Sequence, residues 1–203
     1  RAYTTVHPGA VYLHLGTSYL VRELDESARR AVVERFEADW YTRVKTETAT
    51  TVVRTQLERQ RGGLTLSFGE IAVTEQAVSY ERRATRSHER IDGASLTLPQ
   101  TSFATEAVWL VPGPERLEGI DEMPGLLSAL HAAEHALIAM LPLWTMCDRW
   151  DIGGLSTNVH FQTGLPTVFV YDGHEGGVGI VERGYEAFEG WVADTLRMLE
   201  GCT

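Results

Sequence analysis

Apolar and polar residues alternate along much of residues 1–112, which is the pattern of half-buried β-strands. Two apolar runs, 10–15 and 19–24, are separated by a short turn sequence that contains glycine, and this arrangement predicts a hairpin. Residues 46–56 are rich in Thr and Val, which fit a pleated surface better than a helix, and alternation returns over 64–73. We therefore expect many short strands in close succession, forming a small antiparallel barrel or a strongly curved sheet.

The period of the apolar positions changes after residues 112–114, where two prolines flank a glycine. Apolar residues then recur every three or four positions over 126–141, which predicts a helix that Pro142 ends or kinks. His131 and Ile138 lie on the face next to the main apolar stripe. We therefore expect this helix to be buried over much of its girth, with its histidines facing protein.

A short buried-type strand over 167–171 and a second helical stripe over 181–199 complete the chain. The predicted fold class is α+β, with an antiparallel β-rich, barrel-like segment over 1–112 followed by a helix–strand–helix α/β segment over 113–203. A chain of 203 residues with 43% hydrophobic and 23% charged residues can bury a core, so we expect both segments to be globular.

Charge and cysteine content narrow the function classes. Residues 1–116 hold 15 basic and 15 acidic residues, whereas 117–203 hold 3 basic and 13 acidic residues and so carry the net charge of −10. The second half is therefore a poor candidate for binding a nucleic-acid backbone. Two cysteines cannot form a disulfide framework, and the longest apolar run, 136–147, contains a proline and is too short to span a bilayer. We expect a cytoplasmic protein with no membrane partner.

The sequence His131-Ala132-Ala133-Glu134-His135 matches the HxxEH pattern of the inverted zinc proteases. Two histidines one helical turn apart can share a zinc ion, and the glutamate can act as a general base on the bound water. Cys147 could add a ligand to these histidines, or it could be a free cysteine beside a turn. The alternative is that both histidines are structural and hydrogen-bonded on a core helix, and this is the interpretation that we favour.

A glycine-rich turn over 171–179 lies between the predicted strand and the second helix. Glycines at such a turn let the backbone approach a phosphate at a helix N-terminus. This turn lacks the Lys-Ser/Thr pair of a P-loop, and Asp172 and Glu175 would repel an anion. We therefore interpret it as a tight turn that needs positive φ angles.

Arginine accounts for 17 of the 18 basic residues, and its planar fork suits phosphate recognition. Trp40 and Tyr41 are candidates for stacking on the bases of single-stranded DNA, although a role in the core fits them equally well. The alternative for the arginines is a set of solvated strand ends balanced by Glu58, Glu81 and Glu89. The candidate DNA-contacting residues are Arg54, Arg59, Arg61, Arg82, Arg83, Arg86 and Arg90.

Several motifs occur in a fixed order along the chain: GAVYLHLG at 9–16, DWYT at 39–42, HAAEHAL at 131–137, LPL at 141–143, CDRWDIGG at 147–154, and YDG followed by GGVG within 171–179. Together they resemble the C-terminal region of the MrfA-type superfamily-two DEAD/DEAH-box DNA helicases. The resemblance implies a β-rich segment linked to an MrfA-type zinc-binding domain that is incomplete at its C-terminus.

This resemblance implies a non-catalytic accessory region of an ATP-dependent 3′-to-5′ DNA helicase concerned with DNA repair. Its partners would be single-stranded or 3′-tailed DNA and the motor domains of the same parent chain, in association with the nucleoid. ATP and Mg²⁺ would bind only in those motor domains, whose catalytic residues have no counterpart here. In the family a cysteine cluster that holds zinc follows a segment like 196–203, so Cys202 is the single candidate metal ligand and we expect that zinc to be absent from this chain.

Two other functions remain as alternatives. The first is a zinc-dependent hydrolase of inverted-zincin type that uses His131, Glu134 and His135. The second is a protein-interaction module that uses the acidic second half. Stoichiometric zinc that is lost on His131→Ala, together with a peptidase activity that a chelator removes, would favour the hydrolase.

Overall fold

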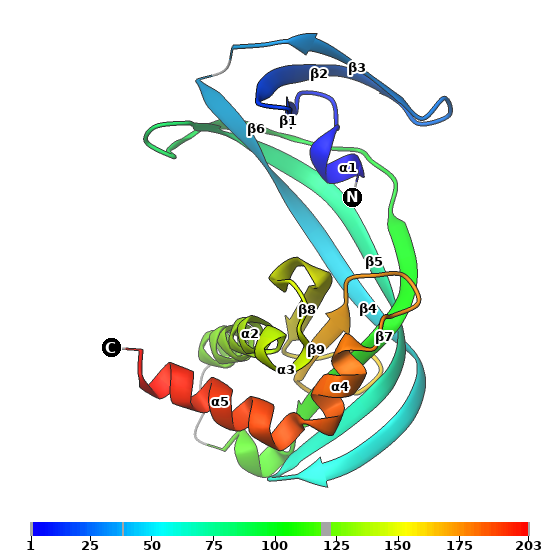
Figure 1. The fold of residues 1–203 in the computed structure, drawn as a ribbon, viewed down its shortest axis with the longest axis vertical. Coiled ribbons are helices and arrows are strands. Elements are labelled where there is room, and N and C mark those ends of the chain that lie inside the picture. The colour runs from blue at the N-terminus through cyan, green and yellow to red at the C-terminus, as the bar shows by residue number, and fades with distance from the viewer. Residues whose placement is uncertain (1, 38, 119–122, 203) are drawn as a thin grey trace. The chain divides into compact units, whose positions relative to one another are not determined.

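The computed structural model describes residues 2–37, 39–118 and 123–202, and Figure 1 shows its fold. The strands are β1 (Val11–His14), β2 (Thr17–Asp25), β3 (Arg30–Arg35), β4 (Trp40–Arg61), β5 (Leu64–Ala84), β6 (Arg90–Ser95), β7 (Thr101–Pro112), β8 (Ile152–Thr157) and β9 (Thr167–Asp172). The helices are α1 (Ala2–Thr5), α2 (Met123–Met140), α3 (Pro142–Thr145), α4 (Ile180–Glu186) and α5 (Phe188–Glu200). The predicted α+β class is confirmed, and neither sheet formed by the described residues closes into a barrel.

Contacts within the chain cluster into two compact units, and each unit is built from two stretches of sequence. Unit 1 comprises residues 1–48 and 75–101, and unit 2 comprises residues 49–74 and 102–203. The strands β4 and β5 each contribute residues to both units. The predicted boundary at residue 112 follows a change in sequence pattern, and it stays a prediction about domain organisation.

Unit 1 contains an antiparallel three-stranded sheet in the order β1-β2-β3. The predicted hairpin is confirmed, since Val11 of β1 lies opposite Leu20 of β2 and the turn contains Gly16 with a φ of 78°. The C-terminal part of β5 pairs antiparallel with β6, where Tyr80 lies opposite Ala94. The one helix of this unit among the described residues is the four-residue α1, so its regular structure is almost entirely strand.

Unit 2 is organised around β9, whose residues are all buried, as the predicted strand over 167–171 requires. The larger sheet has the strand order β4-β5-β7-β9-β8, and β6 pairs with β5 beside this path. β9 is antiparallel to both of its neighbours, with Phe169 opposite Trp109 of β7 and Val170 opposite Gly154 of β8. β8 is the last strand in this order, so it forms one edge of the sheet and brings Ser156 there.

The helix α2 packs on β8 and β9 and lies beside α5 (Figure 1). Its predicted apolar stripe is confirmed, because Leu130, Leu137 and Leu141 at the helix end are buried in the core of unit 2. Trp191 of α5 is fully buried and donates its indole N–H to the carbonyl oxygen of Leu137 at 2.9 Å. This contact ties the two helices together at the level of the HxxEH sequence.

The prediction that α2 is buried over most of its girth is wrong. Ile138 of the neighbouring face is buried, but Leu127, His131 and His135 are exposed. By length and composition alone the segment Gly125–Thr145, with a mean hydropathy of 1.4, could also cross a membrane, so the expectation that no segment is long enough to do so is not confirmed. In this fold the segment supplies core residues to unit 2, and the absence of a membrane partner stays a prediction.

Two other elements differ from the sequence prediction. The helical stripe over 181–199 is divided into α4 and α5 at Ala187, whose φ and ψ of −91° and 14° interrupt the helix. Residues 152–157, for which the sequence pattern predicted no strand, form the strand β8. Their glycines fit a strand because neighbouring side chains fill the space beside them: Tyr171 lies against Gly153, and Glu134 lies against Gly154.

Candidate functional site

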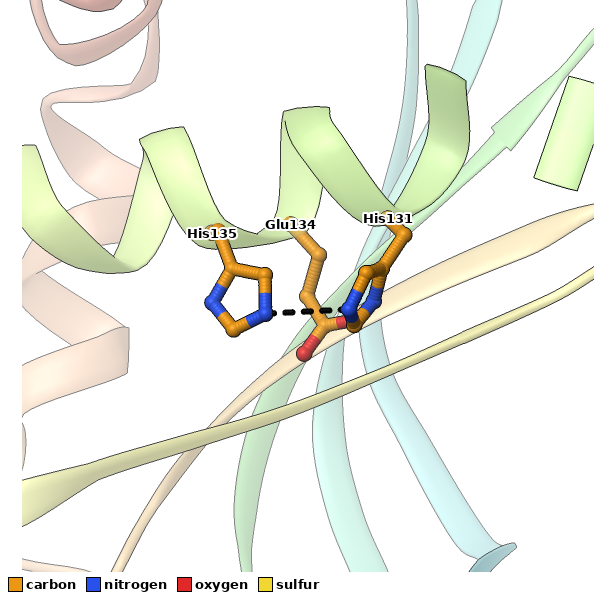
Figure 2. A group of neighbouring side chains, drawn as sticks. All are labelled: His131, Glu134 and His135. Atoms are coloured by element: carbon orange, nitrogen blue, oxygen red, sulfur yellow. Dashed lines mark hydrogen bonds and ion pairs between the residues drawn. The ribbon is translucent and has the colours of Figure 1, made fainter. Parts of the chain in front are cut away.

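His131 and His135 project from α2 on the same side of the helix, one turn apart (Figure 2). Their Nε2 atoms face each other at 3.1 Å, and the two rings are nearly perpendicular, with an interplanar angle of 77°. Both side chains are exposed, that of His131 by 60%. The expectation that these histidines face the protein interior is therefore wrong, and the pair is open to solvent.

Glu134 lies between the two histidines in sequence and is almost fully buried, with 7% of its side chain exposed. The hydroxyl of Ser156, on β8, donates a hydrogen bond to its Oε2 atom at 2.6 Å. The same oxygen is 3.3 Å from Nδ1 of His131. Gly154 makes room for this carboxylate, because a Cβ atom there would lie 2.8 Å from Oε1 of Glu134. Residues of α2 and of the edge strand β8 thus both fix the position of the Glu134 carboxylate.

Among the described residues, His131, Glu134 and His135 are the one group of at least three His, Cys, Asp or Glu side chains close enough to share a metal ion. One potential ligand atom from each lies within 4.8 Å of the others. A hydrolase would need Glu134 free to activate a water molecule, whereas its Oε2 atom is engaged by Ser156 and His131. With its Oε2 atom engaged in this way, Glu134 is better placed to fix the orientation of the His131 imidazole than to activate a water molecule for hydrolysis.

The two cysteines do not form a metal site with other described residues. Cys147 is half-buried, and its sulfur lies 3.2 Å from the hydroxyl of Thr145. Cys202 is exposed after the end of α5. Neither belongs to a group of three potential ligands in the part of the chain that the structure describes, so these residues alone do not fit a cysteine-bound zinc. The role of Cys202 as one ligand of a larger site stays a prediction.

The glycine-rich turn over 171–179 is built around Asp172, which is fully buried. Its carboxylate accepts hydrogen bonds from the backbone N–H groups of Val178, Ile180 and Val181 at 2.6, 3.3 and 3.0 Å. These are the N–H groups that a phosphate would otherwise approach, so the acid occupies the position of an anion. Gly179, with a φ of 81°, precedes α4, and the interpretation as a tight turn with positive φ is confirmed.

Three of the seven candidate DNA-contacting arginines belong to unit 2. Arg59 donates to the carbonyl of Tyr185 at 2.6 Å and lies over its ring, and Arg61 donates to Glu189 at 2.9 Å. The backbone N–H of Glu189, together with Arg61 and Arg59, lowers the pKa of its carboxyl. Arg54 is the most open of the three, since 66% of its side chain is exposed and Glu70 lies 3.9 Å away.

The other four candidate arginines belong to unit 1. Arg82 makes two hydrogen bonds of 2.6 Å with Asp92 and lies 5.1 Å from the ring of Trp40. Glu81 binds both Arg83 and Arg90, and its hydrogen bond with Arg83 lowers the pKa of the Glu81 carboxyl. No hydrogen bond or ion pair involves the side chain of Arg86 within the described residues. Six of the seven arginines thus have acidic partners, and their contact with DNA stays a prediction.

Two exposed aromatic residues of unit 2 have no signal in the sequence pattern. Trp150, in the 3-10 turn Arg149–Asp151, is 79% exposed, and Phe161 in the loop before β9 is 71% exposed. No regular alternation of apolar and polar residues surrounds either ring, so the sequence pattern does not distinguish these exposed aromatic residues from buried ones. Exposed rings of this kind are the groups on which unpaired bases stack.

Comparison with known proteins gives a consistent set of similarities. Residues 133–203 match the family model of the MrfA Zn-binding domain. Over 99% of its length the chain superposes on 27% of the crystal structure of the DUF1998 helicase MrfA bound to DNA, with a TM-score of 0.73 and 26% identity. It is 28% identical to the uncharacterised ATP-dependent helicase YprA of Bacillus subtilis, over 92% of this chain and 25% of that protein.

A third relative is much shorter than the helicases. The uncharacterised protein MJ1572.1 of Methanocaldococcus jannaschii is 37% identical over 76 residues, which are 36% of this chain and 68% of that protein. The chain spans about a quarter of the length of the two helicases that it matches. These similarities give no support to the alternative of a zinc-dependent hydrolase.

Proposed function

Since this chain belongs to the family of MrfA-type helicases and corresponds to their C-terminal region, we propose that it is a non-catalytic accessory region of an ATP-dependent DNA helicase. The observation that carries the proposal is the match of 99% of the chain to MrfA in a DNA-bound crystal structure. The proposal includes 3′-to-5′ polarity, a role in DNA repair and a cytoplasmic, nucleoid-associated location.

The absence of a motor from this chain supports a non-catalytic role. ATP hydrolysis requires a phosphate-binding loop whose lysine and Ser/Thr position the γ-phosphate and Mg²⁺. The single lysine, Lys45, lies in β4 and is not preceded by glycines. The glycine-rich turn before α4 is filled by Asp172. ATP and Mg²⁺ therefore belong to the motor domains of the parent protein.

An apolar groove in unit 2 supports packing against another domain, for which the helicase motor is the proposed partner. The groove has a volume of about 230 Å³ and lies between α2, α5 and the sheet. Leu196 and Leu199 of α5 are about half exposed beside it. Apolar surface of this kind marks contacts with other proteins or domains. The groove is lined by Leu64, Leu110, Pro112, Leu130, Ala133, Leu137, Val168, Phe188, Val192, Thr195, Leu196 and Leu199.

Contact with single-stranded or 3′-tailed DNA is proposed for the arginines that can still reach a phosphate. Arg86 and Arg54 are the most available, one without an ionic partner and one with a long, exposed ion pair. Trp150 and Phe161 offer exposed rings for base stacking. Because the chain carries a net charge of −10, we expect weak binding that disappears as salt is raised.

The experiment is a fluorescence-anisotropy titration of 3′-tailed, single-stranded and blunt DNA at low salt. Arg54→Ala, Arg86→Ala and Trp150→Ala are compared with Arg183→Ala, an exposed arginine paired with Glu186 that is not a candidate DNA contact. We expect each of the first three to weaken binding of tailed DNA several-fold and the control to leave it unchanged.

Two further variants cover the complete candidate set, one with Arg54, Arg59 and Arg61 replaced by Ala and one with Arg82, Arg83, Arg86 and Arg90 replaced by Ala. Binding at micromolar strength or tighter that neither variant weakens by more than about fivefold, or about 1 kcal/mol, would show that DNA is not held by these residues. The single substitutions keep the test valid where the loss of Arg59 disturbs its contact with Tyr185.

A further inference from the structure

We propose that His131 and His135 together bind one divalent transition-metal ion, with Zn²⁺ as the first candidate, through their Nε2 atoms. Among the described residues, neither Cys147 nor Cys202 belongs to this group of potential ligands. The site is also independent of the proposed function, since it rests only on side chains of α2 and β8.

The spacing of the two imidazoles fits a shared ion. Zinc binds histidine nitrogen at about 2.0–2.1 Å in a tetrahedral arrangement, which places two such nitrogens about 3.3 Å apart. The observed separation of the Nε2 atoms of His131 and His135 is 3.1 Å. The i and i+4 positions on α2 bring the two nitrogens to this distance without help from another element (Figure 2).

The hydrogen bonds around Nδ1 of His131 leave the lone pair on its Nε2 atom, which here forms a hydrogen bond of 3.1 Å with Nε2 of His135; a metal ion would replace that hydrogen bond. Ser156 donates its hydroxyl proton to Glu134, so the hydroxyl can only accept from Nδ1 of His131, which lies 3.3 Å away. The carboxylate of Glu134, also 3.3 Å from Nδ1, can likewise only accept. Nδ1 therefore carries the proton, and the lone pair is on Nε2, facing His135. A carboxylate that orients a histidine in this way is the usual second layer of a metal site.

The buried charge of Glu134 also calls for a nearby cation. A buried carboxylate is costly unless it is paired or lies beside a metal. Within the described residues, its partners are Ser156 and His131, and neither an arginine nor a lysine forms an ion pair with it. A metal ion on His131 would supply the positive charge. With two protein ligands, the ion would keep the remaining positions for water or for an anionic oxygen from outside the chain.

The test is a titration of the metal-free chain with Zn²⁺ by calorimetry, together with Co²⁺ absorption spectra. The background variant carries Cys147→Ser and Cys202→Ser, so that thiols make no contribution. We expect one ion per chain and a loss of affinity of at least tenfold in His131→Ala and in His135→Ala. Glu134→Gln should weaken binding by about tenfold or more, since it alters the group that orients His131.

His174→Ala is the matched control, because His174 is exposed to a similar extent and pairs with Asp151 away from α2. It should bind Zn²⁺ as the background variant does. Zn²⁺ should also raise the thermal unfolding midpoint of the background variant and of the control, and not that of the two α2 histidine variants. The proposal is overturned if the Zn²⁺ affinity is unchanged in both His131→Ala and His135→Ala. It is also overturned if the background variant shows no saturable binding up to about 1 mM Zn²⁺.

Discussion

Glu106 lies in a concentration of negative charge in unit 2. Partial burial, together with the charges of Asp172, Glu182 and Glu70, raises the pKa of its carboxyl above the ordinary value of 4.5. Gly177, with a φ of 74°, lies so close that a Cβ atom there would be 2.7 Å from Glu106. The glycine-rich turn thus lies in close contact with Glu106, whose neutral carboxyl is favoured there over its charged form.

The raised pKa fixes the sign of a pH effect. A carboxyl whose pKa is higher in the folded state adds to stability below its unfolded pKa, and this contribution is lost as the pH rises through the folded pKa. We therefore expect Glu106→Gln to increase the free energy of unfolding at pH 7. The difference from the wild type should shrink as the pH falls below about 4.5. Urea unfolding across this pH range measures it.

The control for this prediction is Glu175→Gln, which removes an acid from the exposed part of the same turn. It should change stability little at any pH. A Glu106→Gln variant that is less stable than the wild type at pH 7 would contradict the account of its surroundings.

The sequence predicts the candidate site only in part at the level of residues. The i and i+4 spacing of His131 and His135 is visible in the sequence, and so is Glu134 between them. Ser156, which completes the hydrogen bonding, comes from a distant strand that no local pattern connects to α2. The arginines follow the same rule, because Arg61 finds its partner Glu189 more than a hundred residues away.

At the level of elements, helices and strands were predicted correctly where the apolar pattern is strong, and a strand was missed where it contains two glycines. The leucine stripe of α2 follows the helical period and β9 is a continuous buried run, and both elements form as predicted. β8 was not predicted as a strand, because Gly153 and Gly154 are turn residues by local preference. In the fold they are strand residues, because Tyr171, Glu134 and Ile138 occupy the space that side chains would need.

This contrast yields a prediction about two glycines. In Gly154→Ala the new methyl group would lie 2.5 Å from Cδ1 of Ile138 and 2.8 Å from Oε1 of Glu134, so we expect a loss of about 1–3 kcal/mol. Gly125→Ala, on an open face of α2 with nothing within 4 Å, should instead stabilise the chain by about 0.5–1 kcal/mol. Chemical unfolding of both variants measures the difference. Equal effects of the two substitutions would contradict the packing of α2 on β8.

The same elements show why exposure could not be predicted for α2. A helical period identifies which residues share a face, and it does not identify how many faces a sheet will cover. Leu127 and His131 continue the apolar side of the helix in sequence, yet β8 and β9 cover only the neighbouring stripe. This difference places the two histidines in solvent, where they can bind a ligand.

At the scale of the whole molecule, we expect no ATP hydrolysis by this chain alone. Neither a phosphate-binding lysine loop nor the acidic ligands for Mg²⁺ of a helicase motor are present in the sequence. We expect no hydrolysis above background in a single-turnover assay, with or without DNA. DNA-stimulated hydrolysis that a point mutation in this chain abolishes would show that it contains a catalytic centre after all.

The central claim, that this chain serves a helicase motor, is tested most directly by unwinding of a 3′-tailed duplex. Three proteins are compared: intact YprA of Bacillus subtilis, YprA without the quarter that matches this chain, and a chimera in which this chain replaces that quarter. We expect the truncated protein to unwind much more slowly than the intact one, and the chimera to recover a substantial part of the rate. A chimera that still hydrolyses ATP, and is therefore folded, yet unwinds no faster than the truncated protein would contradict the claim.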